Sequence, residues 1–203
     1  MMRVLLTGFG PFPGAPFNPS ALLVKALARR RRPALADIEL TTHVFATSYA
    51  TVDRDLPKLM AQQPDVVLLF GLAGRRRHLC IETRARNAVT ILFPDADGYK
   101  PQHSVIAADA PSSCRGNAPV MRMLGAARGR FPSRLSRDAG RYLCNYVYWQ
   151  ALQCAQDGRP RVQFIHIPPV RIGPRRPRKQ RPLSFVELVR AAEAILIVLK
   201  AAV

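Results

Sequence analysis

The stretch PDVVLLFGLAG, residues 64–74, is the clearest indicator of the fold in this sequence. It has five consecutive apolar residues, Val66 to Phe70, bounded by a proline and by glycines, which is typical of a strand buried on both faces. Similar segments, RVLLTGF at residues 3–9 and RVQFIHIPP at residues 161–169, lie near the two ends of the chain. Such strands are typical of a parallel sheet that is covered by helices.

Segments with helical spacing of apolar residues alternate with these strands. Asn18 and Pro19 are typical of a helix start, Ser48 is a second candidate cap, and Pro57 is expected to kink or break the helix that follows Ser48. Ser184 and Glu187 predict a capping box for the last helix. Helices are predicted at residues 18–32, 48–63, 118–131, 141–156 and 184–202, with a further strand at residues 38–46.

This alternation predicts the α/β class, with one α/β/α sandwich over residues 1–203. Its mostly parallel, twisted sheet should be covered by helices on both faces. The chain contains neither an internal repeat nor a linker that would divide it. At 203 residues, a single domain buries about 70% of the surface that its unfolded chain exposes, so a substantial core is expected.

The net charge of +18, from 31 basic and 13 acidic residues, is unusual for a chain of this size. The excess lies in basic clusters at residues 29–32, 75–77 and 171–182, the last of which is a proline-rich loop. A solvated basic face is the simpler interpretation, and polyanion binding is the alternative. Nucleic acid is not an expected partner, because aromatic residues for base stacking are not interleaved with the basic ones.

Several classes of protein are not expected from this sequence. Its apolar runs are shorter than the roughly 20 residues that span a bilayer, and its first residues do not resemble a signal peptide, so we expect a cytoplasmic protein. The four cysteines form no CxxC pair, which argues against a zinc site or a disulfide scaffold. Neither a metal nor a cofactor is therefore predicted.

Cys144 is a candidate nucleophile because it lies in the first turn of its predicted helix. The positive end of a helix dipole favours a thiolate, which is the reactive form of cysteine. The alternative is an inert buried thiol, as expected for most cysteines. Cys154 lies farther along the same helix and is predicted on its apolar face.

A reactive cysteine needs a base and a group that orients the base. His166 is predicted at the carboxyl end of a strand, which is the edge of an α/β sheet where ligands generally bind. Glu82 is the acidic residue of the segment HLCIETRARN, residues 78–87. The positions of these residues permit a Glu–His–Cys set without establishing it.

Four segments together resemble the pyroglutamyl peptidase type I family, also called pyrrolidone-carboxylate peptidases. The resemblance covers nearly the whole chain in order, and it rests on LLTGFGPFPGAPFNPS at residues 5–20, GLAGRRRHLCIETRARN at 71–87, SRDAGRYLCNYVYWQAL at 136–152 and VQFIHIPP at 162–169. It implies a cysteine exopeptidase that removes 5-oxoproline from peptide N-termini. In this role Cys144 would be the nucleophile, His166 the general acid and base, and Glu82 the residue that orients the imidazole.

The resemblance also implies the substrate site and the partners. Phe9 and Phe12 match aromatic residues that sandwich the lactam ring, with ordinary core packing as the alternative, and Asn18 matches a polar residue near the ring. The expected partners are peptides with an N-terminal pyroglutamate and, from the family, further copies of this chain in a homo-tetramer.

Two positions depart from the family pattern. Leu72 replaces the glutamine of the common GQAG sequence, and Leu92 aligns with an arginine implicated near the oxyanion. Backbone N–H groups at the start of the Cys144 helix could stabilise the oxyanion instead, or a side chain such as Arg84 or Arg86 could do so. Two other outcomes are a catalytically weak or inactive family member and a basic polyanion-binding protein on the same fold.

Overall fold

The computed structural model describes residues 1–12, 15–155, 157–172 and 183–203. Its main sheet has six strands in the order β2-β1-β3-β8-β4-β7. All neighbouring strands are parallel except β4 and β8, which run in opposite directions. The mostly parallel sheet that the sequence predicts is therefore confirmed. The strands are β1 (Met2–Phe9), β2 (Ile38–Phe45), β3 (Val66–Leu72), β4 (Leu79–Glu82), β7 (Ser133–Ser136) and β8 (Arg161–Ile167).

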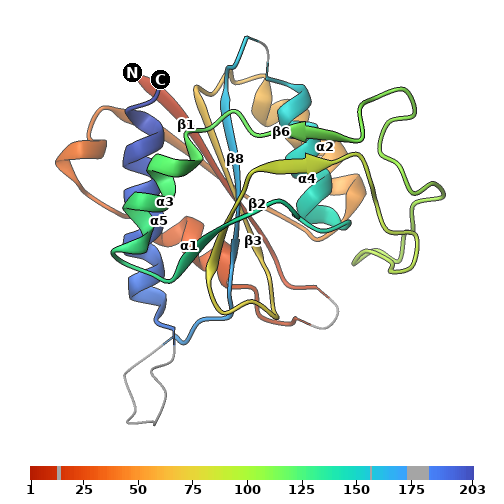
Figure 1. Cartoon of the computed structure of the whole chain (residues 1–203), viewed down its shortest axis with the longest axis horizontal. Coiled ribbons are helices and arrows are strands. Elements are labelled where there is room, and N and C mark those ends of the chain that lie inside the picture. Colours follow the sequence, from red (N-terminus) through yellow and green to blue (C-terminus); the bar gives the residue numbers. More distant parts are fainter. Residues whose placement is uncertain (13–14, 156, 173–182) are drawn as a thin grey trace.

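Helices cover both faces of this sheet, as predicted (Figure 1). On one face lie α1 (Pro19–Ala28), α3 (Val120–Arg128) and α5 (Phe185–Lys200), and on the other lie α2 (Tyr49–Met60) and α4 (Leu143–Gln153). Each face has its own apolar cluster, and the central strand β3 contributes to both. Val66 to Phe70 are fully buried, which explains why this strand is apolar at every position. Smaller elements are the 3-10 helix η1 (Pro33–Leu35) and the antiparallel pair β5 (Arg84–Arg86) and β6 (Ser113–Arg115).

The predicted starts of the first two helices are confirmed. The Asn18 side chain accepts a hydrogen bond from the Ser20 amide at 3.1 Å, and the Ser48 hydroxyl accepts one from the Thr51 amide at 3.4 Å. Each bond satisfies a backbone N–H group that has no partner inside its helix. These two caps fix the first residues of α1 and α2.

Two predictions about helices are corrected. The break expected at Pro57 is absent, because α2 continues through Pro57 to Met60, with Leu56 and Leu59 held in the apolar cluster on either side of the proline. Ser184 precedes α5, but among the described residues its side chain makes no capping hydrogen bond. Here the chain enters the helix through backbone pairing with Arg171 instead.

Part of the large positive charge is used inside the molecule. Arg30 and Arg32, from the first basic cluster, form ion pairs of 2.8 and 3.3 Å with Glu193 of α5. The hydrogen bond from Arg30 lowers the pKa of this carboxyl group below its usual value. Most of the third basic cluster, residues 173–182, lies outside the described residues.

The described ranges contain no helix that is both long and apolar enough to cross a bilayer. Within the same ranges, the His, Cys, Asp and Glu side chains form no group of three or more that could hold a metal ion.

Candidate active site

Strand β4, which carries Glu82, lies next to β8 and runs antiparallel to it. His166 lies near the carboxyl end of β8, as predicted, and Cys80 of β4 is its partner in the antiparallel ladder. Because β4 runs against β8, Glu82 lies deeper in the sheet than His166 and not at the edge where the parallel strands end. The acid therefore approaches the imidazole from inside the sheet.

Glu82 and His166 form a buried pair. His166 Nδ1 lies 2.8 Å from Glu82 Oε1, and the two side chains are 8% and 0% exposed. Because Nδ1 interacts with the carboxylate, the other ring nitrogen, Nε2, is available to exchange a proton with a neighbouring group. Burial alone would lower the pKa of His166, but its hydrogen bonds to Cys144 and Glu82 outweigh this and raise the pKa to about 9. The imidazolium form is therefore favoured at neutral pH.

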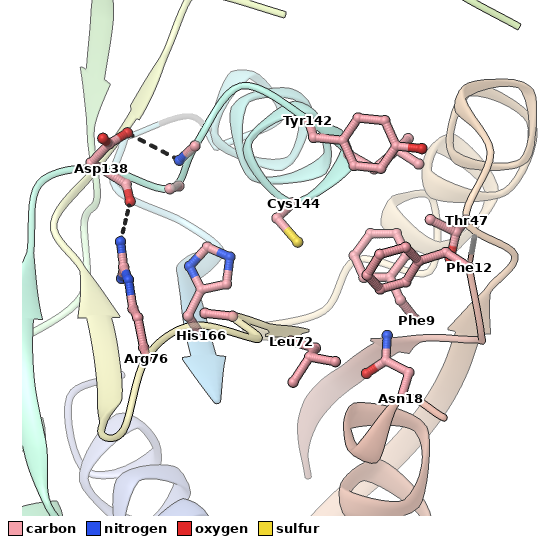
Figure 2. A pocket seen from close by; sticks show the side chains of 14 residues that line it. Phe9, Phe12, Asn18, Thr47, Leu72, Arg76, Asp138, Tyr142, Cys144 and His166 are labelled. Atoms are coloured by element: carbon pink, nitrogen blue, oxygen red, sulfur yellow. Dashed lines mark hydrogen bonds between the residues drawn. The ribbon is translucent and has the colours of Figure 1, made fainter. Parts of the chain in front are cut away.

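Cys144 is the second residue of α4, which confirms its predicted place in the first turn of a helix. The side chain lies beside the His166 ring on one wall of a cavity (Figure 2). Cys154 was predicted on the apolar face of the same helix, and this is wrong. The helix ends at Gln153, and Cys154 is exposed just beyond its last turn.

A glycine makes room for the Cys144 sulfur. Gly71 of β3 is the ladder partner of His166, and a Cβ atom added at Gly71 would lie only 2.7 Å from Cys144 Sγ. The same atom would lie 2.7 Å from the ring of Phe164, so neighbours block it on more than one side. Gly71 thus allows the thiol-bearing helix to approach the sheet closely.

We expect Gly71→Ala to lower kcat by about 100-fold, because a displacement of about 1 Å at reacting atoms has an effect of that order. Steady-state kinetics of the purified variant would measure this loss. Gly74→Ala is the matched control, since a Cβ atom at Gly74 meets no other atom within 4 Å. Equal activity of the Gly71 variant and the wild type would contradict the steric role.

The cavity beside Cys144 has a volume of about 280 Å³. All three predicted substrate residues, Phe9, Phe12 and Asn18, line it together with Cys144 and His166. Phe9 also packs against Phe45 with ring centroids 5.8 Å apart, so it contributes to the core as well. Figure 2 shows Phe9 and Phe12 facing the sulfur from the opposite wall. The other lining residues are Thr47, Leu72, Ala73, Arg76, Asp138, Ala139, Gly140, Tyr142 and Leu143.

The two departures from the family pattern have different locations. Leu72 lines the cavity, so an apolar side chain lies at the position where the resemblance implies a glutamine. Leu92 is 70% exposed and is not a lining residue. Arg84 and Arg86 also lie outside the lining set, and they interact with the Arg137 carbonyl and the Asp138 carboxylate. The side chains of Leu92, Arg84 and Arg86 therefore do not reach the cavity.

Sequence reasoning missed Arg76, Thr47 and Tyr142 as cavity residues. Tyr142 is two residues before Cys144, and Thr47 is two residues after the end of β2. Proximity to a candidate nucleophile or to a strand end was therefore the sequence signal that could have identified them. Arg76 was counted only as part of a basic cluster. Its contact with Glu82 depends on how the β3–β4 loop folds back.

A thiol and an imidazole at the end of an α/β sheet, with a carboxylate buried deeper in the sheet behind the imidazole, form the arrangement that thiol hydrolases use. A family model described as pyroglutamyl peptidase matches residues 2–197. The chain belongs to the pyroglutamyl peptidase family.

Individual relatives agree with this assignment. The pyrrolidone-carboxylate peptidase of Thermococcus onnurineus (strain NA1) is 32% identical over 200 residues, which cover 97% of each chain. The corresponding protein of Vibrio vulnificus (strain CMCP6) is 34% identical over 170 residues, or 83% of this chain and 79% of that one. The structure of pyrrolidone carboxyl peptidase from Thermococcus litoralis superposes with a TM-score of 0.86 at 27% identity, covering 100% of this chain and 95% of that one.

Proposed function

We propose that this protein is an active cysteine exopeptidase that hydrolyses the peptide bond after an N-terminal pyroglutamate (5-oxoproline). The observation that carries the proposal is the chain of hydrogen bonds from Glu82 through His166 to Cys144, which ends at a cavity lined by Phe9 and Phe12. Family membership supports the same chemistry.

In the first half of the reaction, the Cys144 thiolate attacks the carbonyl carbon of the pyroglutamyl residue and forms a tetrahedral intermediate. The imidazolium of His166 then donates its proton to the departing amine as the C–N bond breaks. The shortened peptide leaves with a free amino group, and the pyroglutamyl group remains on the sulfur as a thioester. Glu82 stays ionised and keeps the imidazole oriented throughout.

In the second half, His166 removes a proton from water, and the resulting hydroxide attacks the thioester carbonyl. Collapse of this second intermediate breaks the C–S bond and releases 5-oxoproline. For the oxyanion of both intermediates we assign the backbone N–H groups in the first turn of α4, which have no acceptor within the helix. This is the alternative that best fits the exposed position of Leu92.

The cavity suits a small, flat and uncharged ring. Phe9 and Phe12 would contact the two faces of the lactam, and Leu72 would add apolar surface. Asn18 donates one of its amide N–H groups to the Gly10 carbonyl at 3.1 Å, which fixes the side chain and leaves a second N–H for the lactam carbonyl.

A chromogenic pyroglutamyl amide tests the proposal, with the matching prolyl amide as control. Prolyl amide has the same ring size but lacks the lactam carbonyl, so a site built to bind that oxygen should discriminate by about 10⁴-fold in kcat/KM. Absence of turnover with fully reduced protein would identify an inactive family member. Equal turnover of both amides would reject the lactam site.

We propose a single peptidase domain over residues 1–203 in the cytoplasm, where the reducing environment would preserve the four free cysteines. We propose a homo-tetramer from the family, which light scattering would test. In the first two basic clusters, Arg30, Arg32 and Arg76 form ion pairs with buried carboxylates, so their charges serve the fold, and polyanion binding would depend on the other arginines.

A further inference from the structure

Arg76 connects three segments that meet at the candidate active site. The residue lies in the loop between β3 and β4, where its amide donates to the Ala73 carbonyl in a tight turn. Its guanidinium donates to Glu82 Oε1 at 2.8 Å through Nη1 and to the Asp138 carbonyl at 2.9 Å through Nη2. Figure 2 shows this side chain beside His166 and in contact with the Asp138 segment.

The contact with Glu82 involves the oxygen that also faces the imidazole. Glu82 Oε1 lies 2.8 Å from both Arg76 Nη1 and His166 Nδ1. The carboxylate is completely buried, and Oε2 has no hydrogen-bond partner among the described residues. A buried carboxylate is stable in its charged form only when it is paired. Arg76 supplies a permanent positive charge that does not depend on the protonation of His166.

The contact with Asp138 involves the segment that leads into the nucleophile helix. The Asp138 carboxylate accepts a hydrogen bond from the Gly140 amide at 3.1 Å, and Gly140 has a φ of +84°. This turn leads to α4, of which Cys144 is the second residue. One planar guanidinium thus holds both the acid of the triad and the start of the turn before the thiol.

We propose that Arg76 is a positioning residue of this active site, which keeps Glu82 ionised and oriented toward His166 and holds the Asp138 turn that presents Cys144. The inference rests on the proposed function for its catalytic consequence. The terminal nitrogens of Arg76 donate to Glu82, Ser136 and Asp138, and none of these acceptors is a reacting atom.

Other titratable groups also face Glu82. Cys80 lies two residues before it on β4, His166 approaches from β8, and the Tyr148 hydroxyl of α4 donates to the Glu82 backbone carbonyl at 3.1 Å. Burial raises the pKa of both Cys80 and Tyr148, so both remain protonated at neutral pH. Within this set, Arg76 is the group whose charge stays fixed while His166 and Cys144 exchange a proton.

The test compares pH profiles of kcat/KM for Arg76→Gln, Arg76→Lys and Arg75→Gln. Removing a nearby cation favours the protonated form of every neighbouring group, so Arg76→Gln should move both limbs of the profile to higher pH by about one unit. The loss of positioning should lower kcat by about 10- to 100-fold with a smaller change in KM. Arg76→Lys keeps the positive charge, so both limbs of its pH profile should lie at the wild-type pH. Its kcat should recover only in part, because lysine cannot bond to both Glu82 and Asp138 as the planar guanidinium does.

Arg75 is the matched control, because it has the same charge in the same loop. It is exposed, and no hydrogen bond or ion pair joins it to another described residue. Arg75→Gln should therefore leave the profile unchanged. Thermal unfolding of each variant would show whether the fold is retained.

A second measurement separates this inference from the proposed function. The pH dependence of Cys144 alkylation by iodoacetamide, followed by mass spectrometry of its peptide, reports the thiolate without any peptidase activity. A shift to higher pH in Arg76→Gln alone supports the positioning role even if the pyroglutamyl amide is not hydrolysed. Unchanged profiles in folded Arg76→Gln, or an equal shift in Arg75→Gln, would overturn it.

Discussion

Cys144→Ser is expected to lower kcat/KM for a pyroglutamyl amide by at least about 10³-fold, with little effect on folding. A serine hydroxyl releases its proton far less readily than a thiol, so the proton transfer to His166 that the proposed mechanism needs would become unfavourable. The sulfur also packs closely against Gly71 and the imidazole, and the smaller serine oxygen would not fill the same space. Steady-state kinetics with the reduced protein would measure the loss.

Cys154→Ser is the matched control for this substitution. Cys154 lies at the other end of the same helix, is exposed, and donates to the Gln150 carbonyl at 3.4 Å. The control should retain the activity of the wild type. If Cys144→Ser kept more than about a tenth of the wild-type rate, another residue would have to be the nucleophile.

Glu82→Gln is expected to lower kcat by about 10⁴-fold, as loss of the orienting carboxylate does in other triads. An amide at this position lacks the charge that stabilises the imidazolium. It also presents N–H groups to Arg76 or His166, which are themselves donors. The fall should therefore appear mainly in kcat, since Glu82 is not one of the residues that line the cavity.

The same substitution should change the pH dependence in a defined direction. Burial lowers the pKa of His166, and its hydrogen bonds to Cys144 and Glu82 raise it to about 9. The imidazolium is thus present below pH 9 in the wild type and is lost as the pH rises through that value. Without the carboxylate the pKa falls, so the alkaline limb of kcat/KM should move to lower pH.

Glu193→Gln provides the control for loss of a buried carboxylate. Glu193 is 4% exposed and pairs with Arg30 and Arg32 on the opposite face of the sheet. Its replacement should reduce the free energy of unfolding without moving the alkaline limb. An alkaline limb that stays at the same pH in Glu82→Gln would contradict the proposed pairing with His166.

Most of the fold could be predicted because its central strands are buried on both faces. Strands β1, β3 and β8 are apolar over most of their length, and the caps at Asn18 and Ser48 are local features that a sequence displays directly. Strand β7 was not predicted, because its sequence SRLS is short and half exposed at the edge of the sheet. The antiparallel direction of β4 was not predictable either, since direction depends on pairing with distant strands.

For the candidate site, sequence reasoning found the groups whose chemistry is distinctive. A cysteine at a helix start and a histidine at a strand end can be recognised one at a time. Arg76 and Gly71 could not be recognised in this way, because their roles depend on atoms brought near by folding. Arg76 resembles its exposed neighbour Arg75 in sequence, and Gly71 resembles any glycine that ends a strand.

The reversed strand β4 has a consequence for how the acid of the site is held in place. Glu82 belongs to β4, which is hydrogen-bonded to β7 on one side and to β8 on the other. Because β4 is hydrogen-bonded on both sides, the backbone of Glu82 has a fixed position, unlike that of a carboxylate residue in a surface loop. The depth at which the acid meets the imidazole is therefore set by strand pairing and not by the long connection between β5 and β6, residues 87–112.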